Sequence, residues 1–430
     1  MAEDPDSPLE YRWIVTFARS LPRPTRMFMV AAAISQMGNT GLILATATIS
    51  ADAAPTAPQA ATYTAVMFFL FFAWSALATP FTGRLTSWLG ALPAFLMIQV
   101  ASFAVWAAIA LLIGLGIPGY PLLLISSVVF GALAGWNMPL NQVALSSYAP
   151  TADRARSIAV MGAAQGVGSV VGGPLAGLIV DWVGPIWVLA FNAVSSLPLA
   201  WLIVAVSPVQ TPQAPSRAGG SLRAVWNAVH SKTAIRSAVV VATTSALLIG
   251  PMTHMVVPFA RDLNHELALH AGLLLGALAA GHMVSPVLLP RLRHANHGVA
   301  SVRAYVMAAC AMVLVAVVAT VLDGSSELIM LMMILIVFAA GSMTGRAYLI
   351  NFGQTESDEE KRTSHLAAYF LAVTVGVMVG SLIWGQLFAT VGSAWSMVIF
   401  GVGTLLTMIF YWRALLRGDR SPGSQSVGSQ

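Results

Sequence analysis

Twelve long apolar segments, separated by short loops, constrain most strongly how this chain can fold. The segments form two sets of six, because landmark residues of the first set recur 208 positions later in the second. The matched residues are Gly90 and Gly298, Arg154 and Arg362, Gly172 and Gly380, Gly177 and Gly385, and Gly184 and Gly392. One or two matches could arise by chance, but five at equivalent positions predict a duplicated helical bundle whose halves move around a central cavity.

The composition matches a protein whose solvent is a lipid bilayer. Only 9% of the residues are charged and 57% are hydrophobic, whereas a soluble domain carries about 25% charged residues. A helix needs about 20 apolar residues to cross a bilayer. We therefore expect an all-α integral membrane protein with twelve transmembrane helices in two pseudo-symmetric six-helix bundles. The net charge of +5 lies mainly in one set of loops, as membrane orientation requires, so we expect no nucleic-acid partner.

Hydropathy and turn-forming residues place the helices and the domain boundaries. We expect helices at 27–49, 62–82, 93–115, 120–144, 155–180 and 185–206 in the first half. In the second half we expect them at 235–257, 267–289, 299–321, 327–349, 363–388 and 394–414. The stretch 207–234 opens with Pro, Ser and Gly, which is typical of a linker. The predicted units are a leader (1–26), bundles at 27–206 and 235–414, this linker, and a disordered tail (415–430).

The distribution of basic residues predicts the orientation in the membrane. If the N-terminus is cytoplasmic, the outer loops hold only Arg261, Arg346 falls within a span, and every other Arg and Lys lies inside. Cytoplasmic loops of membrane proteins carry such an excess of basic residues. We therefore expect both termini in the cytoplasm of a bacterium, with the chain in the inner membrane. A monomer suffices for this architecture.

The loop after the second segment carries the first part of a family motif. Gly83, Leu85 and Gly90 fit the pattern G-x-L-a-D-r-x-G, but Ser87 replaces its aspartate and Trp88 its arginine. With the six-plus-six arrangement, the motif makes the chain resemble the major facilitator superfamily of secondary transporters. In that family the aspartate is thought to latch the outward-open state, so the resemblance implies a weaker latch here. The two glycines could also serve only to make tight turns.

A second motif lies in the fifth segment and resembles the G-x-x-x-G-P-x-x-G pattern of exporters in this superfamily. It consists of Gly168, Gly172, Gly173, Pro174 and Gly177. Small residues let helices approach closely and proline bends a helix, so the pattern fits either a gating element or ordinary helix packing.

The fourth segment lacks an arginine that proton-driven drug exporters of this superfamily often carry. The family pattern is R-x-x-x-G, but Gly131 stands at the arginine position, four residues before Gly135.

Ionisable groups within spans are costly and are therefore candidates for function. All Asp and Glu residues lie in tails, loops or helix ends, which argues against a carboxylate proton relay. The proton-coupling candidates are His254, because histidine titrates near neutral pH, and Asp52 at the end of the first segment. His254 and His282 could equally be packing histidines, and His365 is expected near the cytoplasmic surface.

Arg346 is the one basic residue expected inside a span. It belongs to the tenth helix, which the resemblance places at the cavity. A guanidinium in this position needs a carboxylate, a phosphate or water. It could bind an anionic part of a substrate, or it could extend to the inner surface and meet the acidic loop 356–360.

Uncharged polar residues on the first, fourth, seventh and tenth helices complete the predicted binding site, because these helices line the cavity in the family. The predicted substrate-binding residues are Gln36, Asn39, Thr40, Trp136, Asn137, Asn141, Thr243, His254, Ser342 and Arg346. Such residues also form hydrogen bonds between helices, and both roles are compatible.

The sequence shows no metal-ligand cluster, no nucleotide-binding loop of the G-x-x-x-x-G-K-[ST] type and no cofactor motif. We therefore expect no enzymatic activity, cofactor or metal, and a transport energy taken from a gradient, with protons as the candidate coupling ion. The leading hypothesis is export of a small polar, zwitterionic or anionic organic solute by alternating access. A uniporter or importer is the first alternative. A transporter-like protein with an enzymatic or assembly role is the second.

Overall fold

The computed structural model describes residues 20–149, 154–209, 230, 232–263, 267–291, 297–356 and 362–418. Within this part of the chain, twelve helical spans are long and apolar enough to cross a membrane. The predicted fold class of twelve helices in two six-helix halves is confirmed. Residues 1–19 of the predicted leader, most of the linker and most of the tail lie outside the described residues.

The first half follows the predicted helix order. Its helices are α2 (Arg23–Asp52), α3 (Ala57–Ala78), α5 (Ala91–Gly114), α6 (Gly119–Tyr148), α7 (Arg154–Val183) and the pair α8 (Pro185–Ser195) and α9 (Leu197–Ala205). A short 3-10 turn, η1 (Thr79–Phe81), joins α3 to α4 (Thr82–Leu89), so the predicted loop motif is largely helical. The motif ends where Gly90 turns the chain with a φ of 84°.

The second half repeats this order, with one interruption in its first span. That span consists of α11 (Thr233–Ile249), the 3-10 turn η3 (Gly250–Thr253) and α12 (Val256–Asp262). The remaining helices are α13 (Ala268–Arg291), α14 (His297–Val321), α15 (Gly324–Glu356), α16 (Arg362–Val391) and α17 (Ser393–Gly418). The sequence predicts an unbroken helix at 235–257, but Pro251 lacks a backbone N–H and interrupts the helical bonds.

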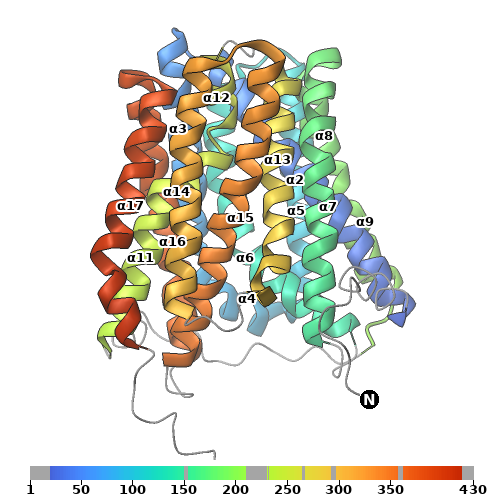
Figure 1. Ribbon diagram of the computed structural model, residues 1–430. Coiled ribbons are helices and arrows are strands. Elements are labelled where there is room, and N and C mark those ends of the chain that lie inside the picture. Colours follow the sequence, from blue (N-terminus) through green and yellow to red (C-terminus); the bar gives the residue numbers. More distant parts are fainter. Residues whose placement is uncertain are drawn as a thin grey trace, which may run out of the picture.

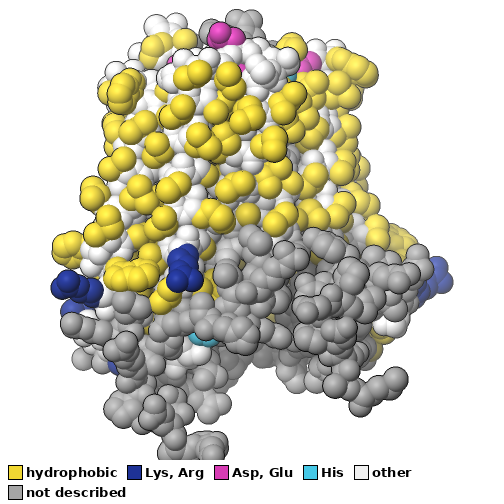
Figure 2. Space-filling model, in the orientation of Figure 1, with side chains coloured by type: hydrophobic (Ala, Val, Ile, Leu, Met, Phe, Trp, Pro, Cys, Tyr) yellow, Lys and Arg dark blue, Asp and Glu magenta, His cyan; other side chains and the backbone are white. Residues whose placement is uncertain are grey.

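On the face visible in Figure 2, the described surface between the two ends is largely apolar, as a lipid-facing surface must be. Large side chains such as Trp182 and Phe410 are 77% and 80% exposed. On the visible face, Lys and Arg side chains lie near one end and Asp and Glu near the other. We call the end where α2 begins and α17 ends the terminal end, and the opposite end, where α12 lies, the distal end (Figure 1).

Glycines of α7 pack on two faces of that helix. Gly168 and Gly172 face α2, because an added Cβ would collide with the carbonyl oxygens of Ala33 and Met37. Gly173 and Gly177 face α13 of the other half, where an added Cβ at Gly177 would lie 2.6 Å from the Ala268 carbonyl oxygen. The predicted packing motif therefore serves two interfaces. One of them is the seam between the halves.

The second half contains an equivalent glycine seam on α16. Gly376 and Gly380 face α11, and Gly385 faces α3 of the first half near Ala61 and Ala65. Gly172 and Gly380 approach the first helix of their own half, and Gly177 and Gly385 approach the opposite half. The 208-residue offset therefore relates equivalent packing positions as well as identical residue types.

The remaining matched positions agree less uniformly. Gly184 and Gly392 both turn the chain with positive φ, at 96° and 82°, and Arg154 and Arg362 both begin helices. Gly90 also has a positive φ, whereas Gly298 lies inside α14. The repeat is therefore structural at four of the five pairs.

Candidate functional site

A cavity of about 240 Å³ lies inside the first half and draws on almost every helix of it. We call it the aromatic cavity. Its lining residues are Ser35, Asn39, Leu42, Ile43, Thr46, Met67, Phe68, Phe71, Gln99, Ser102, Trp106, Ser127, Phe130, Leu133, Ala134, Asn137, Asn192, Ser195, Ser196 and His254. Of the lining residues that the structure describes, only His254 comes from the second half, and it is also the only one with an ionisable side chain.

A second cavity, of about 330 Å³, adjoins the first and shares Ser35, Asn39, Ala134 and Asn137 with it. We call it the carboxamide cavity. Its other lining residues are Ala32, Gln36, Phe95, Met138, Asn141, Gln142, Met161, Gln165 and Leu199. Among the described residues of this lining no side chain is ionisable, and six of the thirteen are Asn or Gln.

The order of residues along the helices separates the polar and apolar parts of this space. On α2, Asn39 precedes Leu42 and Ile43, and on α5, Gln99 precedes Trp106. The helix α6 runs in the opposite direction, and there Phe130 precedes Asn137. All three helices therefore place their carboxamides toward the terminal end and their apolar side chains toward the distal end.

Glycines explain how α6 can bring its side chains against α3. An added Cβ at Gly131 would collide with the Phe71 carbonyl, and one at Gly135 with the Ser75 carbonyl. The Trp136 indole N–H also donates to the Ala78 carbonyl across 2.8 Å. The family arginine predicted to be missing at Gly131 could not fit here without separating these two helices.

Hydrogen bonds fix several of the carboxamides. The Gln99 side chain donates to the Asn137 side-chain oxygen across 3.0 Å, while the Ser196 hydroxyl donates to the backbone carbonyl of Gln99 across 3.2 Å and joins the sixth span to α5. The Gln36 side chain donates to the Ser169 hydroxyl across 3.1 Å, which joins α2 to α7. These bonds orient the amides before any solute arrives, which lowers the cost of binding.

His254 reaches the aromatic cavity from the broken span of the second half. It directly follows η3, and its ring centroid lies 4.5 Å from Phe68 and 4.9 Å from Phe72. Its Nδ1 atom is buried and has no hydrogen-bond partner among the described residues. Since Pro251 ends α11 three residues earlier, the break in this span is what carries the imidazole toward α3.

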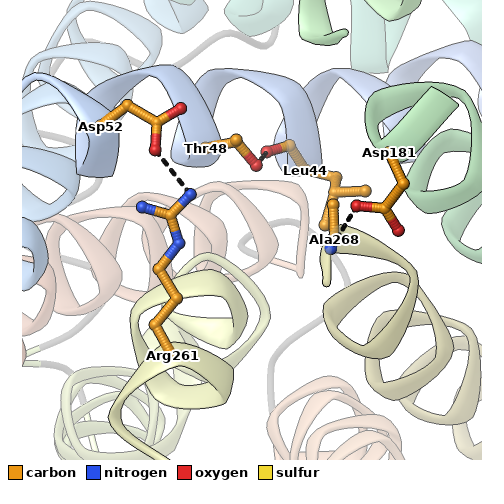
Figure 3. Close-up of polar contacts among 6 residues, drawn as sticks. All are labelled: Leu44, Thr48, Asp52, Asp181, Arg261 and Ala268. Carbon is orange, nitrogen blue, oxygen red and sulfur yellow. Dashed lines mark hydrogen bonds and ion pairs between the residues drawn. The ribbon is translucent and has the colours of Figure 1, made fainter. Parts of the chain in front are cut away.

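Polar contacts join the halves at the distal end (Figure 3). The Arg261 guanidinium of α12 forms an ion pair with Asp52 of α2 at 2.7 Å. The Asp181 carboxylate of α7 accepts from the backbone N–H groups of Ala268 and Leu269, at 2.8 and 2.9 Å. These are the first turn of α13, where unpaired N–H groups and the helix dipole favour a negative charge.

The structure brings together half of the predicted substrate-binding residues. Gln36, Asn39, Asn137, Asn141 and His254 line one or both cavities.

The other five predicted residues line neither cavity. The hydroxyls of Thr40, Thr243 and Ser342 donate to carbonyls of their own helices, those of Gln36, Val239 and Ala339. Trp136 binds Ala78 as described, and Arg346 lies within the second half. Whether these residues contact a solute in another conformation stays a prediction.

Arg346 lies in an aromatic cluster of α15 and α16. Its guanidinium carbon is 5.8 Å from the centre of the Phe370 ring, and the Tyr369 hydroxyl donates to its backbone carbonyl at 3.4 Å. His365 is buried beside a pocket of only about 20 Å³ between α11, α15 and α16, and His282 lines none of these cavities. The Arg346 guanidinium therefore lies apart from the two cavities.

The other functional predictions fall outside the cavities. Asp52 lies in the distal ion pair, and its role in proton coupling stays a prediction. In the loop motif, the Ser87 hydroxyl donates to the Arg84 carbonyl and Trp88 is 85% exposed. Within the described residues, no group of three or more His, Cys, Asp or Glu side chains is placed to hold a metal ion.

Several cavity residues were not predicted, although their spacing offered a signal. Gln99, Ser102 and Trp106 follow an i, i+3, i+7 pattern on α5, and Asn192, Ser195 and Ser196 follow i, i+3, i+4 on the sixth span. Such spacings place side chains on one helix face. The predicted binding site does not include these residues, because the family resemblance places only the first, fourth, seventh and tenth helices at the cavity.

The family model of the Major Facilitator Superfamily matches residues 28–357. The chain belongs to this superfamily. Its fold is that of a membrane transporter of a solute, and a transporter of this superfamily is generally not an enzyme. No curated protein matches the chain in sequence.

Solved structures of other superfamily members share the fold over nearly the whole chain. A xylose transporter from E. coli in an inward-open conformation has a TM-score of 0.71 at 14% identity, covering 93% of this chain and 96% of that one. A nucleoside transporter has a TM-score of 0.70 at 11% identity, covering 91% and 100%. A POT family peptide transporter has a TM-score of 0.68 at 13% identity, covering 95% and 99%. At these identities the likeness shows the fold alone.

Proposed function

We propose that this superfamily member is a secondary transporter that exports a small polar organic solute by alternating access. The observation that carries the proposal is the pair of adjoining cavities, which together offer an interior lined by carboxamides, hydroxyls and aromatic rings. Small-molecule sites combine an apolar lining with a few placed polar groups in this way. Alternating access then requires the halves to separate at the distal end, where the Asp52, Asp181 and Arg261 contacts lie.

Export is the direction favoured by the glycine motif of α7, which resembles the pattern of exporters and packs on both α2 and α13. The terminal end is proposed to be cytoplasmic. Among the described residues, Arg84 of α4 and Arg303 near the start of α14 lie toward this end, and Arg261 of α12 lies at the other. A bacterial inner membrane and a monomer fit this arrangement.

Proton coupling is proposed to act through His254. Among the described residues it is the one ionisable side chain that lines either cavity, and none of the lining residues described carries a carboxylate. A histidine can exchange a proton near neutral pH without extreme tuning. Uniport is the alternative that this sparse set of ionisable groups favours.

The direction and solute are tested in cells. Mass spectrometry compares metabolites released by cells with and without the gene, and a solute enriched outside only when the gene is present supports export. Accumulation of the same solute inside the cells would instead support import. No difference in any released or retained metabolite would contradict the transport proposal.

The coupling is tested in proteoliposomes with the solute identified in this way. Counterflow is measured with and without a pH gradient, for the natural protein and for His254→Gln, which keeps a polar side chain but cannot titrate. We expect the gradient to accelerate transport by the natural protein and to have no effect on the variant, while exchange without a gradient persists in both. Exchange that never responds to the gradient establishes uniport.

A further inference from the structure

The carboxamide cavity has an unusual concentration of one functional group. Six of its lining residues carry a side-chain amide, and they come from three helices. These residues are Gln36 and Asn39 of α2, Asn137, Asn141 and Gln142 of α6, and Gln165 of α7. Gln99 of α5 adds a seventh amide through its bond to Asn137. Packing alone does not require so many amides around one hollow, because interhelical bonds use only some of their donors and acceptors.

A primary amide offers two donors and an acceptor without carrying a charge. A ring of such groups can bind hydroxyls and amides, which also donate and accept. A charged solute would lose its hydration here without meeting an opposite charge, and that loss is expensive. The carboxamide cavity therefore favours an uncharged solute rich in hydroxyl or amide groups.

The adjoining aromatic cavity favours a different part of the same solute. Phe68, Phe71, Trp106 and Phe130 give it several ring surfaces, and Trp106 and Phe130 pack edge to face at 5.1 Å. Aromatic walls favour flat apolar groups through area burial and ring stacking. Since the two cavities share Asn39 and Asn137, one elongated molecule can occupy both.

Each end also contains a buried polar atom whose bonding is incomplete. Trp106 is 3% exposed, and its indole N–H has no acceptor among the described residues. The buried side-chain oxygen of Asn141 likewise has no donor among them. Buried polar groups are normally paired, and unpaired ones cost stability. Small movements on solute entry could give both atoms a partner.

We propose that the two cavities form one site for an uncharged two-part solute. Its hydroxyl- or amide-bearing part lies against the carboxamides and its flat apolar part against the aromatic rings. This inference rests on the proposed transport function, and it names the class of solute for that site. Neutral aryl glycosides have this chemistry, whereas free sugars and charged glycosides each lack one element of it.

The test measures binding to the full-length protein in lipid nanodiscs, because glycoside detergents share the hydroxyl-bearing part of the proposed solute and would compete. The probes are phenyl β-glucoside, glucose, and phenyl β-glucuronide, whose carboxylate adds a negative charge. We expect phenyl glucoside to bind at least tenfold more tightly than either of the others. Phenyl glucuronide binding as tightly as phenyl glucoside would overturn the proposal.

Two variants test the two ends of the site. Asn141→Ala removes one carboxamide and Phe71→Leu removes one ring while keeping its bulk. Each should weaken phenyl glucoside binding about fivefold to tenfold, the value of one neutral hydrogen bond or one stacking contact. Gln386→Ala is the matched control, because Gln386 is an exposed carboxamide of α16 outside both cavities, and it should bind like the natural protein.

The outcomes separate this inference from the transport proposal. Thermal melting shows whether each variant is folded. If Asn141→Ala and Phe71→Leu are both folded and both bind phenyl glucoside with unchanged affinity, the two-part site is overturned. Export of some other metabolite without glycoside binding would overturn the inference and leave the transport function intact. Glycoside binding without transport of any solute would support the two-part site and overturn the transport proposal.

Discussion

The two halves share a helix order and a glycine seam, but their interiors differ in chemistry. The first half is hollow, and the eight carboxamides that line its two cavities lie near four aromatic rings. The second half surrounds Arg346 with Phe370 and Tyr369 and has a pocket of about 20 Å³ between α11, α15 and α16. The glycine contacts between the halves are therefore alike in both, whereas the two interiors differ.

This difference suggests a division of labour between the halves. The first half holds the groups that can recognise a solute, and the second contributes His254 as its single side chain in the aromatic cavity. A solute bound in the first half would therefore be sensed by the second half through one residue on its interrupted span. The following experiments break or sharpen this comparison, from the largest expected effect to the smallest.

The shared seam should be the most sensitive region. Gly177→Leu places a branched side chain where even a Cβ would lie 2.6 Å from the Ala268 carbonyl oxygen. Overpacking of this kind costs about 1–3 kcal/mol, and here the cost is paid only when α7 and α13 are in contact. We expect transport in proteoliposomes to fall by more than about tenfold, with a lower melting temperature.

Gly162→Ala is the control for the seam, because Gly162 lies on the same helix and an added Cβ there meets nothing within 4 Å. It should leave transport unchanged. Equal effects of the two substitutions would show that the glycines act through helix propensity, and the seam would lose its proposed role.

The distal cap should have an intermediate effect on conformation. Asp181→Asn keeps the shape of the side chain but removes the charge that accepts from Ala268 and Leu269 at the start of α13. Such charge-assisted bonds at a helix N-terminus contribute about 0.3–1 kcal/mol at an exposed site. We therefore expect a shift of about twofold to fivefold toward a distal-open state, measured by spin-label distances across that end.

A second distal carboxylate provides the comparison for this shift. Asp323 is exposed between α14 and α15, and Asp323→Asn changes the net charge by the same amount within one half. It should leave the distance distribution unchanged. A similar shift in both variants would assign the effect to general charge, not to the cap.

Arg346 should have the smallest effect on recognition. Arg346→Gln removes the guanidinium from the aromatic cluster of α15 and α16, but the Arg346 side chain lines neither cavity. We expect the affinity for a neutral solute, measured in nanodiscs, to change by less than twofold. A loss of tenfold or more would support the sequence-based prediction that this guanidinium binds the solute, and the division of labour would be wrong.

Hydropathy and internal repetition were sufficient to predict the spans, because a bilayer leaves no other way to bury a helix backbone. Predicting the interruption of the seventh span would have required giving Gly250 and Pro251 more weight than the apolar run that continues past them. The two glycine faces of α7 are also implicit in the sequence, since Gly172 and Gly173 differ by one residue and so point in directions about 100° apart. Only the coordinates identify which helix each face meets.

The site was predicted less completely than the fold. Asn39, Asn137 and Asn141 were identified from their spacing, but Gln99 and Asn192 lie outside the four helices that the resemblance places at the cavity. Polar spacing alone does not reveal whether a face meets a hollow or a neighbouring helix. That outcome depends on how far apart the helices are held, which depends in turn on close contacts elsewhere, such as those of Gly131 and Gly135 with α3.

The proline in the seventh span has a mechanical consequence. A continuous helix must break backbone hydrogen bonds in order to bend, but at Pro251 a donor is already missing. The seven residues of α12 can therefore tilt relative to α11 at little cost in hydrogen bonding. The helix α12 begins two residues after His254, and near its other end Arg261 is paired with Asp52. If an arriving solute displaced the His254 imidazole, α12 would therefore transmit the movement over about two helical turns to the Arg261–Asp52 ion pair, which joins the two halves at the distal end.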